Sequence, residues 1–136
     1  MKKLLAGAAI ALAALASSAQ ADGHANYPER PIMLMVSYGA GGATDFQARI
    51  VTMTAGNDDA LGMPVAIINK PGAGGTVGNT LALRAKADGY TLLFNASTFV
   101  TAPMTMKSVP YKVQTDFTPI ALVASAPLSI AVSNKL

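Results

Sequence analysis

The chain contains no cysteine, and His24 is its only histidine. Without cysteine it can form no disulfide, carries no thiol nucleophile and has no lipoprotein anchor, so its stability must come from a packed core. A Ser-His-Asp triad would have to recruit His24, which lies in a polar stretch near the N-terminus. Metal-ligand types do not cluster either. We therefore expect no metal, no cofactor and no catalytic residues.

Long hydrophobic runs are also scarce, and the longest, Leu4–Ala16, has a specific setting. Lys2 and Lys3 precede it, and Ala19-Gln20-Ala21 follows with small residues at the first and third positions. The run is shorter than the roughly 20 apolar residues that a membrane-spanning helix needs. This order predicts a secretory signal peptide over residues 1–21, cleaved after Ala21, and a periplasmic location.

A large excess of one charge is missing as well. The chain has 10 basic and 7 acidic residues, and removal of Lys2 and Lys3 with the signal peptide leaves a net charge of about +1. Nucleic-acid binding domains carry a basic patch or stripe. We therefore expect no nucleic-acid partner.

The remaining sequence alternates buried runs with segments of helical spacing. Residues 32–36 and 65–68 are continuous apolar runs, typical of strands in a parallel sheet, and residues 90–94 predict a third strand. Phe46, Ile50 and Met53 predict a helix that ends near Ala55, with Thr44 or Asp45 as its N-cap. A second helix is expected from about residue 77 to 86. The order predicts an α/β fold with a mostly parallel sheet.

The pattern is looser after Phe94. Residues 100–106 predict a short helix interrupted by Pro103, and residues 107–119 form a connector. Residues 121–124 and 128–132 are apolar and predict two further strands.

A four-residue repeat, Gly-Ala-Gly-Gly, occurs at 39–42 and again at 72–75. Each copy follows a predicted strand and precedes a predicted helix, so both loops should emerge at the carboxyl edge of the sheet. Backbone N–H groups at a helix N-terminus suit a carboxylate or a phosphate. Tight strand-to-helix turns are the alternative explanation for these glycines.

Nucleotide motifs do not fit the two loops. No Gly-Lys pair exists for a P-loop, and Gly72, Gly74 and Gly78 are spaced one residue too widely for a dinucleotide fingerprint. Asp45 is the carboxylate of most interest, because it lies where the first loop meets its helix. It could cap that helix or contact a cationic or hydroxyl group of a ligand.

With both loops placed, the sequence resembles the Bug-type periplasmic solute-binding receptors of tripartite tricarboxylate transporters. The matching segments are 27–32, 41–45, 48–49, 69–75, 88–92 and 116–120. The resemblance implies two α/β lobes that close on a ligand like a flytrap, with the glycine loops holding a carboxylate. The ligand-binding positions that it implies are Tyr38, Ala40, Gly41, Gly42, Thr44, Asp45, Gly72, Ala73, Gly74, Gly75, Thr76, Asn95, Ser97 and Thr98.

The resemblance also implies a function and a domain organisation. The chain is expected to bind a small di- or tricarboxylate and to deliver it to membrane permease subunits, without being an enzyme. Residues 22–118 would form most of a first lobe, and 119–136 the crossover and first strand of an incomplete second lobe in a partial sequence. The alternatives are an exported enzyme acting on a carboxylate- or phosphate-bearing small molecule through Ser37, Thr44, Asp45 or Ser97, and a purely structural exported domain.

Overall fold

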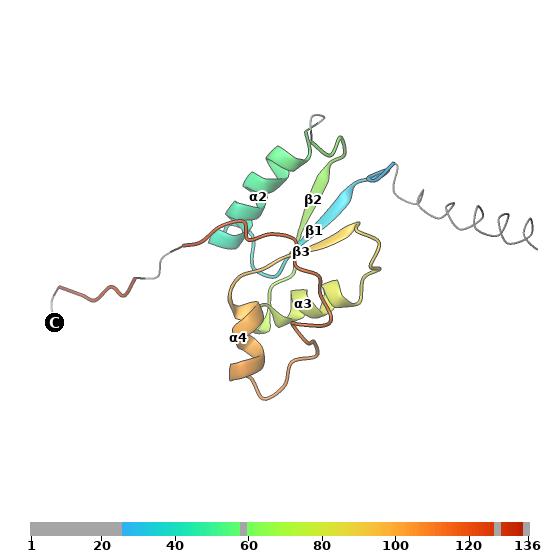
Figure 1. Cartoon of the computed structure of the whole chain (residues 1–136). Coiled ribbons are helices and arrows are strands. Elements are labelled where there is room, and N and C mark those ends of the chain that lie inside the picture. Colours follow the sequence, from blue (N-terminus) through green and yellow to red (C-terminus); the bar gives the residue numbers. More distant parts are fainter. Residues whose placement is uncertain (1–25, 58–59, 127–128, 135–136) are drawn as a thin grey trace, which may run out of the picture.

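The computed structural model describes residues 26–57, 60–126 and 129–134 of the 136-residue chain. The predicted signal peptide over 1–21 lies outside these residues. Strands and helices alternate in the described part (Figure 1). They are β1 (Ile32–Val36), α2 (Ala43–Ala55), β2 (Val65–Asn69), the 3-10 turn η2 (Ala73–Gly75), α3 (Thr76–Leu83), β3 (Thr91–Phe94) and α4 (Thr98–Thr105).

The three strands form one parallel sheet in the order β2-β1-β3. Ile32 pairs with Val65 and Val36 with Asn69, while Val36 also pairs with Phe94. β1 is the central strand, which is why its run of apolar residues is buried on both faces. The predicted α/β class, the parallel sheet and the three strands are confirmed.

The helices cover the sheet from both sides. α2 packs against β1 and β2, and α3 packs against β1 and β3. In Figure 1 the two helices lie on opposite sides of the strands. The core comprises Leu34, Val36 and Ala48, surrounded by Tyr38, Val65, Ile67, Leu92 and Phe94.

The helix boundaries differ in detail from the predicted ones. α2 ends at Ala55 as expected, but its N-cap is Gly42, so the prediction of Thr44 or Asp45 as N-cap is wrong. Asp45 lies in the first turn instead and reaches back toward the loop. α3 ends at Leu83 rather than near 86, because Arg84 is its C-cap and the chain then turns at Gly89.

α4 begins at Thr98 and continues through Pro103, where the sequence predicted an interruption. Proline has no N–H, so the carbonyl of Phe99 loses its helical donor. The Tyr111 hydroxyl replaces that donor at 3.3 Å. A partner distant in sequence therefore allows this helix to accommodate its proline.

The two strands predicted at 121–124 and 128–132 are wrong for the residues that the structure describes there. Leu122 is 88% exposed and Ile130 is 97% exposed. A strand needs a neighbouring strand to pair its backbone groups, and no described segment pairs with these residues. In Figure 1 the final red piece of the chain, residues 129–134, lies away from the strands.

Candidate functional site

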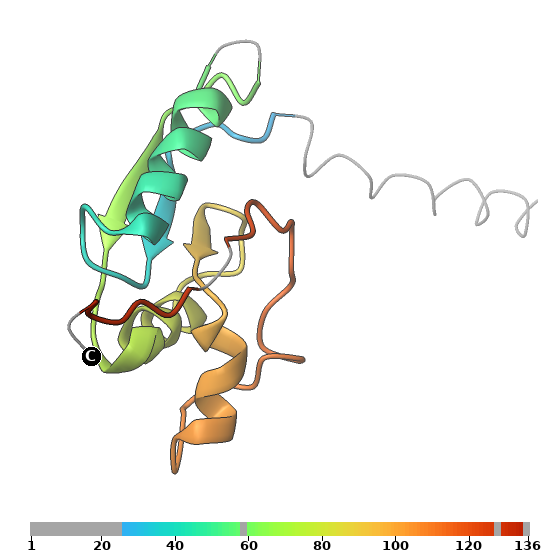
Figure 2. The ribbon, with the colours of Figure 1, turned by 90° about the vertical axis from the view of Figure 1, so that its left-hand side faces the viewer.

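The carboxyl ends of the three strands lie side by side. Val36, Asn69 and Phe94 are register partners at the ends of β1, β2 and β3. The loops that follow, 37–42, 70–75 and 95–97, therefore emerge at one edge of the sheet, and Figure 2 shows this edge from another side. The expectation that both glycine loops share an edge is confirmed.

The second glycine loop makes a sharp turn into α3. Residues 72 to 75 all have positive φ, including Ala73 at 46°. A Cβ on Gly75, whose φ is 92°, would lie 3.2 Å from the Tyr38 hydroxyl oxygen. Only glycine accommodates this conformation together with so close an approach. The second loop is therefore fitted directly against the first.

Tyr38 connects the three loops. Its hydroxyl hydrogen-bonds with Thr98 Oγ1 at the start of α4, and its carbonyl accepts a 3.0 Å hydrogen bond from Asn69 Nδ2. Its ring lies against Gly75. The structure thus brings Tyr38, Gly75 and Thr98, three of the predicted binding residues, into one group.

Asp45 is held by a network behind the first loop. Its Oδ2 accepts hydrogen bonds from Gly41 N–H and Arg49 Nε, both at 2.8 Å. Its Oδ1 accepts from Asn69 Nδ2 at 2.9 Å and from Arg49 at 3.3 Å. These bonds, with the one from Arg49 foremost, lower the pKa of the carboxyl from 3.8 to about 2. Asp45 is only 1% exposed. Its hydrogen bond from Gly41 N–H holds the first loop in place.

The start of α2 presents free backbone donors. The first intrahelical bond runs from Phe46 N–H to the Gly42 carbonyl at 2.9 Å. The N–H groups of Ala43 and Thr44 therefore have no partner within the helix, and they lie at the positive end of its dipole. Ala40, Gly41 and Gly42 are exposed beside them. This geometry suits an anion.

The remaining predicted residues lie at the same edge. Thr76 begins α3, and its Oγ1 donates to the Ala73 carbonyl at 2.9 Å. Asn95 follows β3, and Ser97 is the N-cap of α4, with its carbonyl accepting from Val100 N–H at 3.0 Å. All the predicted positions therefore gather where the three strands end.

Sequence reasoning missed a buried polar chain beneath this edge. Ser37 Oγ donates to Asn79 Oδ1 at 2.7 Å, and Asn79 Nδ2 donates to the Tyr111 hydroxyl at 3.1 Å. Ser37 and Asn79 are at most 1% exposed. Arg49 and Asn69 were also overlooked as partners of Asp45. The spacing of Arg49, four residues after Asp45, was the one available signal.

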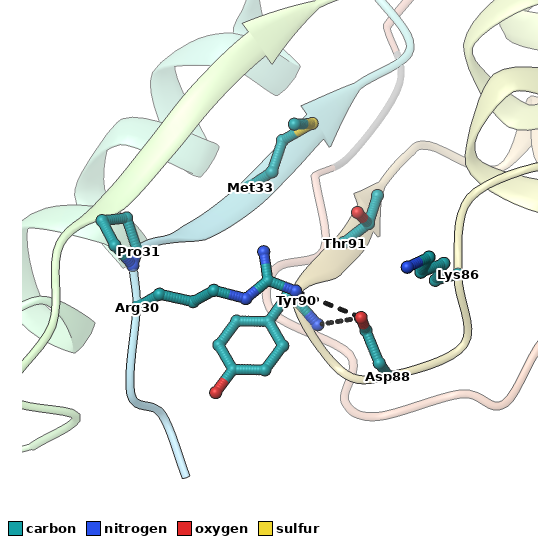
Figure 3. A pocket seen from close by; sticks show the side chains of 7 residues that line it. All are labelled: Arg30, Pro31, Met33, Lys86, Asp88, Tyr90 and Thr91. Atoms are coloured by element: carbon teal, nitrogen blue, oxygen red, sulfur yellow. Dashed lines mark hydrogen bonds and ion pairs between the residues drawn. The ribbon is translucent and has the colours of Figure 1, made fainter.

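A hollow of about 330 Å³ lies at the opposite, amino edge of the sheet (Figure 3). Arg30 and Asp88 form an ion pair across it at 3.1 Å, and the Arg30 guanidinium lies 3.9 Å from the Tyr90 ring centroid. None of the predicted binding residues lines this hollow. The other lining residues are Pro31, Met33, Lys86 and Thr91.

Among the residues that the structure describes, no three His, Cys, Asp or Glu side chains gather as a metal site would require. None of the helices in this described part combines the length and apolar character needed to cross a membrane.

Comparisons with known proteins give one family. Residues 48–135 match the model described as "Tripartite tricarboxylate transporter family receptor" (TctC). The chain is 41% identical to protein BugT of Bordetella pertussis, an alignment that covers 100% of the chain and 41% of BugT. It is 36% identical to a UPF0065 protein from the tcbD-tcbE intergenic region of a Pseudomonas species, covering 96% of the chain and 38% of that protein.

Solved structures were also found. One is titled "Structure of periplasmic binding protein BugD", with 46% identity, a TM-score of 0.47, and coverage of 49% of this chain and 22% of the other. The chain spans about two fifths of the length of the curated relatives it matches. The family is described as one of transporter receptors. On the extent of the family match and the identity to BugT, the chain belongs to the tripartite tricarboxylate transporter receptor family.

Proposed function

We propose that the chain is part of an extracytoplasmic solute receptor that binds a small organic carboxylate and delivers it to the permease subunits of a tripartite tricarboxylate transporter. The observation that carries the proposal is the convergence of two glycine loops at one sheet edge. Each loop runs directly into a helix of eight residues or more. The free N–H groups of Ala43 and Thr44 at the start of α2 offer carboxylate oxygens two donors, and the second loop emerges at the same edge.

The two glycine loops, at 39–42 and 72–75, would hold one carboxylate group between them. Tyr38 and Thr98 would close one side of the site, since their hydroxyls hydrogen-bond with each other between the first and third loops. Asp45 contributes by position, because both of its oxygens already accept bonds from Gly41, Arg49 and Asn69. Asn95 and Ser97 would supply further polar contacts from the third loop.

The location and domain organisation are parts of the same proposal. Residues 1–21 would direct export to the periplasm, with cleavage after Ala21, and BugD is titled a periplasmic binding protein. Residues 22–118 would belong to the first lobe of a two-lobed receptor, and 119–136 would lead into the second. The exposed apolar side chains at 120–123 are in keeping with such a crossover.

The enzyme alternative has less support. Ser37, one of its candidate nucleophiles, is fully buried, and its hydroxyl donates a hydrogen bond to Asn79 Oδ1. Asp45 has a low pKa, about 2, which makes it a poor base near neutral pH. The family description names a receptor.

The proposal can be tested by NMR titration of residues 22–136 with citrate, succinate and glutarate. We expect weak binding, with Kd of about 1 mM or above, because one lobe supplies half of a flytrap cleft. Shifts should concentrate at the amides of 41–45 and 72–76. Succinamide, which has the same length without the charges, is the matched control ligand.

Two variants locate the site. Tyr38→Phe removes a hydroxyl at the loops and should weaken binding by about threefold to tenfold. Tyr27→Phe removes a hydroxyl that donates to Gly89 O at the opposite edge, and should leave binding unchanged. Equal shifts with succinate and succinamide would contradict an anion site. Micromolar binding by this chain alone would contradict the two-lobe part of the proposal.

A further inference from the structure

A directional chain of three hydrogen bonds runs beneath the candidate site. Ser37 Oγ donates to Asn79 Oδ1, Asn79 Nδ2 donates to the Tyr111 hydroxyl, and that hydroxyl donates to the Phe99 carbonyl. Each of the three side chains is at most 4% exposed. Hydrogen bonds linked in this way in a buried environment strengthen one another, and loss of one leaves a buried group unpaired.

The members of the chain come from every segment that carries a loop of the site. Ser37 is the residue before Tyr38 in the first loop. Asn79 lies one turn into α3, which follows the second loop. Phe99 is the second residue of α4, next to Thr98, and follows the third loop. Tyr111 belongs to the connector between α4 and the C-terminal segment.

Two local features of the sequence make this chain possible. A Cβ on Gly78 would lie 2.8 Å from Ser37 Cα and from the Lys70 carbonyl, so only glycine lets α3 approach β1 closely enough for Asn79 to reach Ser37. Pro103 frees the Phe99 carbonyl to accept from Tyr111.

Tyr111 is fixed by its ring independently of its hydroxyl. The ring stacks on Phe99 with centroids 5.3 Å apart, and Phe117 packs edge-on against both rings. Removal of the hydroxyl alone should therefore leave the connector in place. This makes it possible to separate the hydrogen-bond chain from the aromatic packing.

We propose that Ser37, Asn79 and Tyr111 are positioning residues, which hold the three loops of the carboxylate site at a fixed spacing without touching the ligand. The proposal rests on the proposed function for the identity of the ligand. How firmly the loops are held can nevertheless be measured without a ligand.

The experiment is amide hydrogen exchange on the full chain carrying Tyr111→Phe. We expect exchange about fivefold to tenfold faster at 38–42, 72–76 and 97–101, because each loop loses part of its anchor. Exchange in β1 and β2, at 33–35 and 66–68, should change less. Tyr27→Phe is the matched control and should leave all three loops as they are, since its hydroxyl bonds to Gly89 at the amino edge. Ser37→Ala, which removes the other end of the chain, should reproduce the pattern of Tyr111→Phe.

Two results would overturn the proposal. One is unchanged exchange in the loops of Tyr111→Phe, and the other is an equal increase across loops and strands, which would indicate a general loss of stability. NMR titration with citrate and succinate separates this inference from the proposed function. If the loops loosen but neither compound shifts any amide of the unmodified chain, the carboxylate assignment fails and the positioning role remains.

Discussion

The two edges of this small sheet are held together in different ways. At the carboxyl edge, Ser37, Asp45 and Asn79 are buried, and each buried polar atom of their side chains has a hydrogen-bond partner. At the amino edge, the side chains of Arg30 and Asp88 are 59% and 38% exposed. Exposed ion pairs contribute little to stability, whereas a broken buried network leaves unpaired polar groups at a considerable cost. The edge proposed to bind ligand is therefore also the more rigidly specified one.

This difference between the two edges shows what the segments that resemble the receptor family do. Residues 27–32 and 88–92 meet at the amino edge, where the Tyr27 hydroxyl donates to the Gly89 carbonyl at 2.7 Å and the Tyr90 hydroxyl accepts from Glu29 N–H at 2.9 Å. The two tyrosine rings also pack edge to face. These segments fasten the start of β1 to the start of β3. The segments at 41–45 and 69–75, in contrast, build the candidate site.

Among variants at the two edges, Gly78→Ala is expected to lower the free energy of unfolding most. The new methyl group would lie 2.8 Å from backbone atoms of Ser37 and Lys70, which are not free to move aside. Overpacking of this kind costs about 1–3 kcal/mol in the free energy of unfolding, measured by urea denaturation.

Gly39→Ala is the matched control for that variant. A Cβ at Gly39 meets nothing within 4 Å, so the free energy of unfolding should change by less than about 0.5 kcal/mol. Equal effects at positions 39 and 78 would show that α3 does not depend on its close approach to β1.

The second-largest loss of stability is expected from Asp45→Asn, and this loss should depend on pH. The pKa of the Asp45 carboxyl is about 2 in the folded chain, below its ordinary value of 3.8. A lowered carboxyl pKa stabilises the fold above the unfolded-state value, and this contribution is lost as the pH falls from about 4 to about 2. Asp45→Asn should therefore be less stable than the unmodified chain at pH 6, and the difference should shrink toward pH 2.

Asp116→Asn controls for other carboxylates. The Lys112 backbone N–H lowers the pKa of Asp116 too, but this residue lies in the exposed connector. Its substitution should leave the loss of stability between pH 4 and pH 2 largely in place. Chemical denaturation at several pH values measures the free energy of unfolding of the unmodified chain and of the two variants. A constant difference between Asp45→Asn and the unmodified chain across this range would contradict the role given to the Asp45 charge.

The sequence predicted those features that depend on local pattern. The runs containing Leu34 and Ile67 identified parallel strands because residues buried on both faces leave no alternation. The repeated glycines were placed at one edge because each copy follows a strand and precedes a helix, and parallel strands end at the same edge. The strands expected at 121–124 and 128–132 were wrong for the described residues because a strand depends on a partner that local pattern does not reveal. The chain from Ser37 to Asn79 and Tyr111 joins residues 42 and 32 positions apart, and a single sequence contains no sign of such pairings.

The smallest effect is expected at the amino edge, from Arg30→Ala. This change removes the ion pair with Asp88 and the contact with the Tyr90 ring. Exposed interactions of these two kinds contribute about 0–1 kcal/mol each, so the midpoint of urea denaturation should move only slightly. Arg30→Lys, which keeps the charge but not the planar group over the ring, divides the effect between its two causes. Because the effect is partly electrostatic, it should decrease further in 1 M salt, whereas the effect of Gly78→Ala should not. A loss at Arg30 as large as that at Gly78 would mean that the two edges are equally important to the fold, and the contrast between them would not hold.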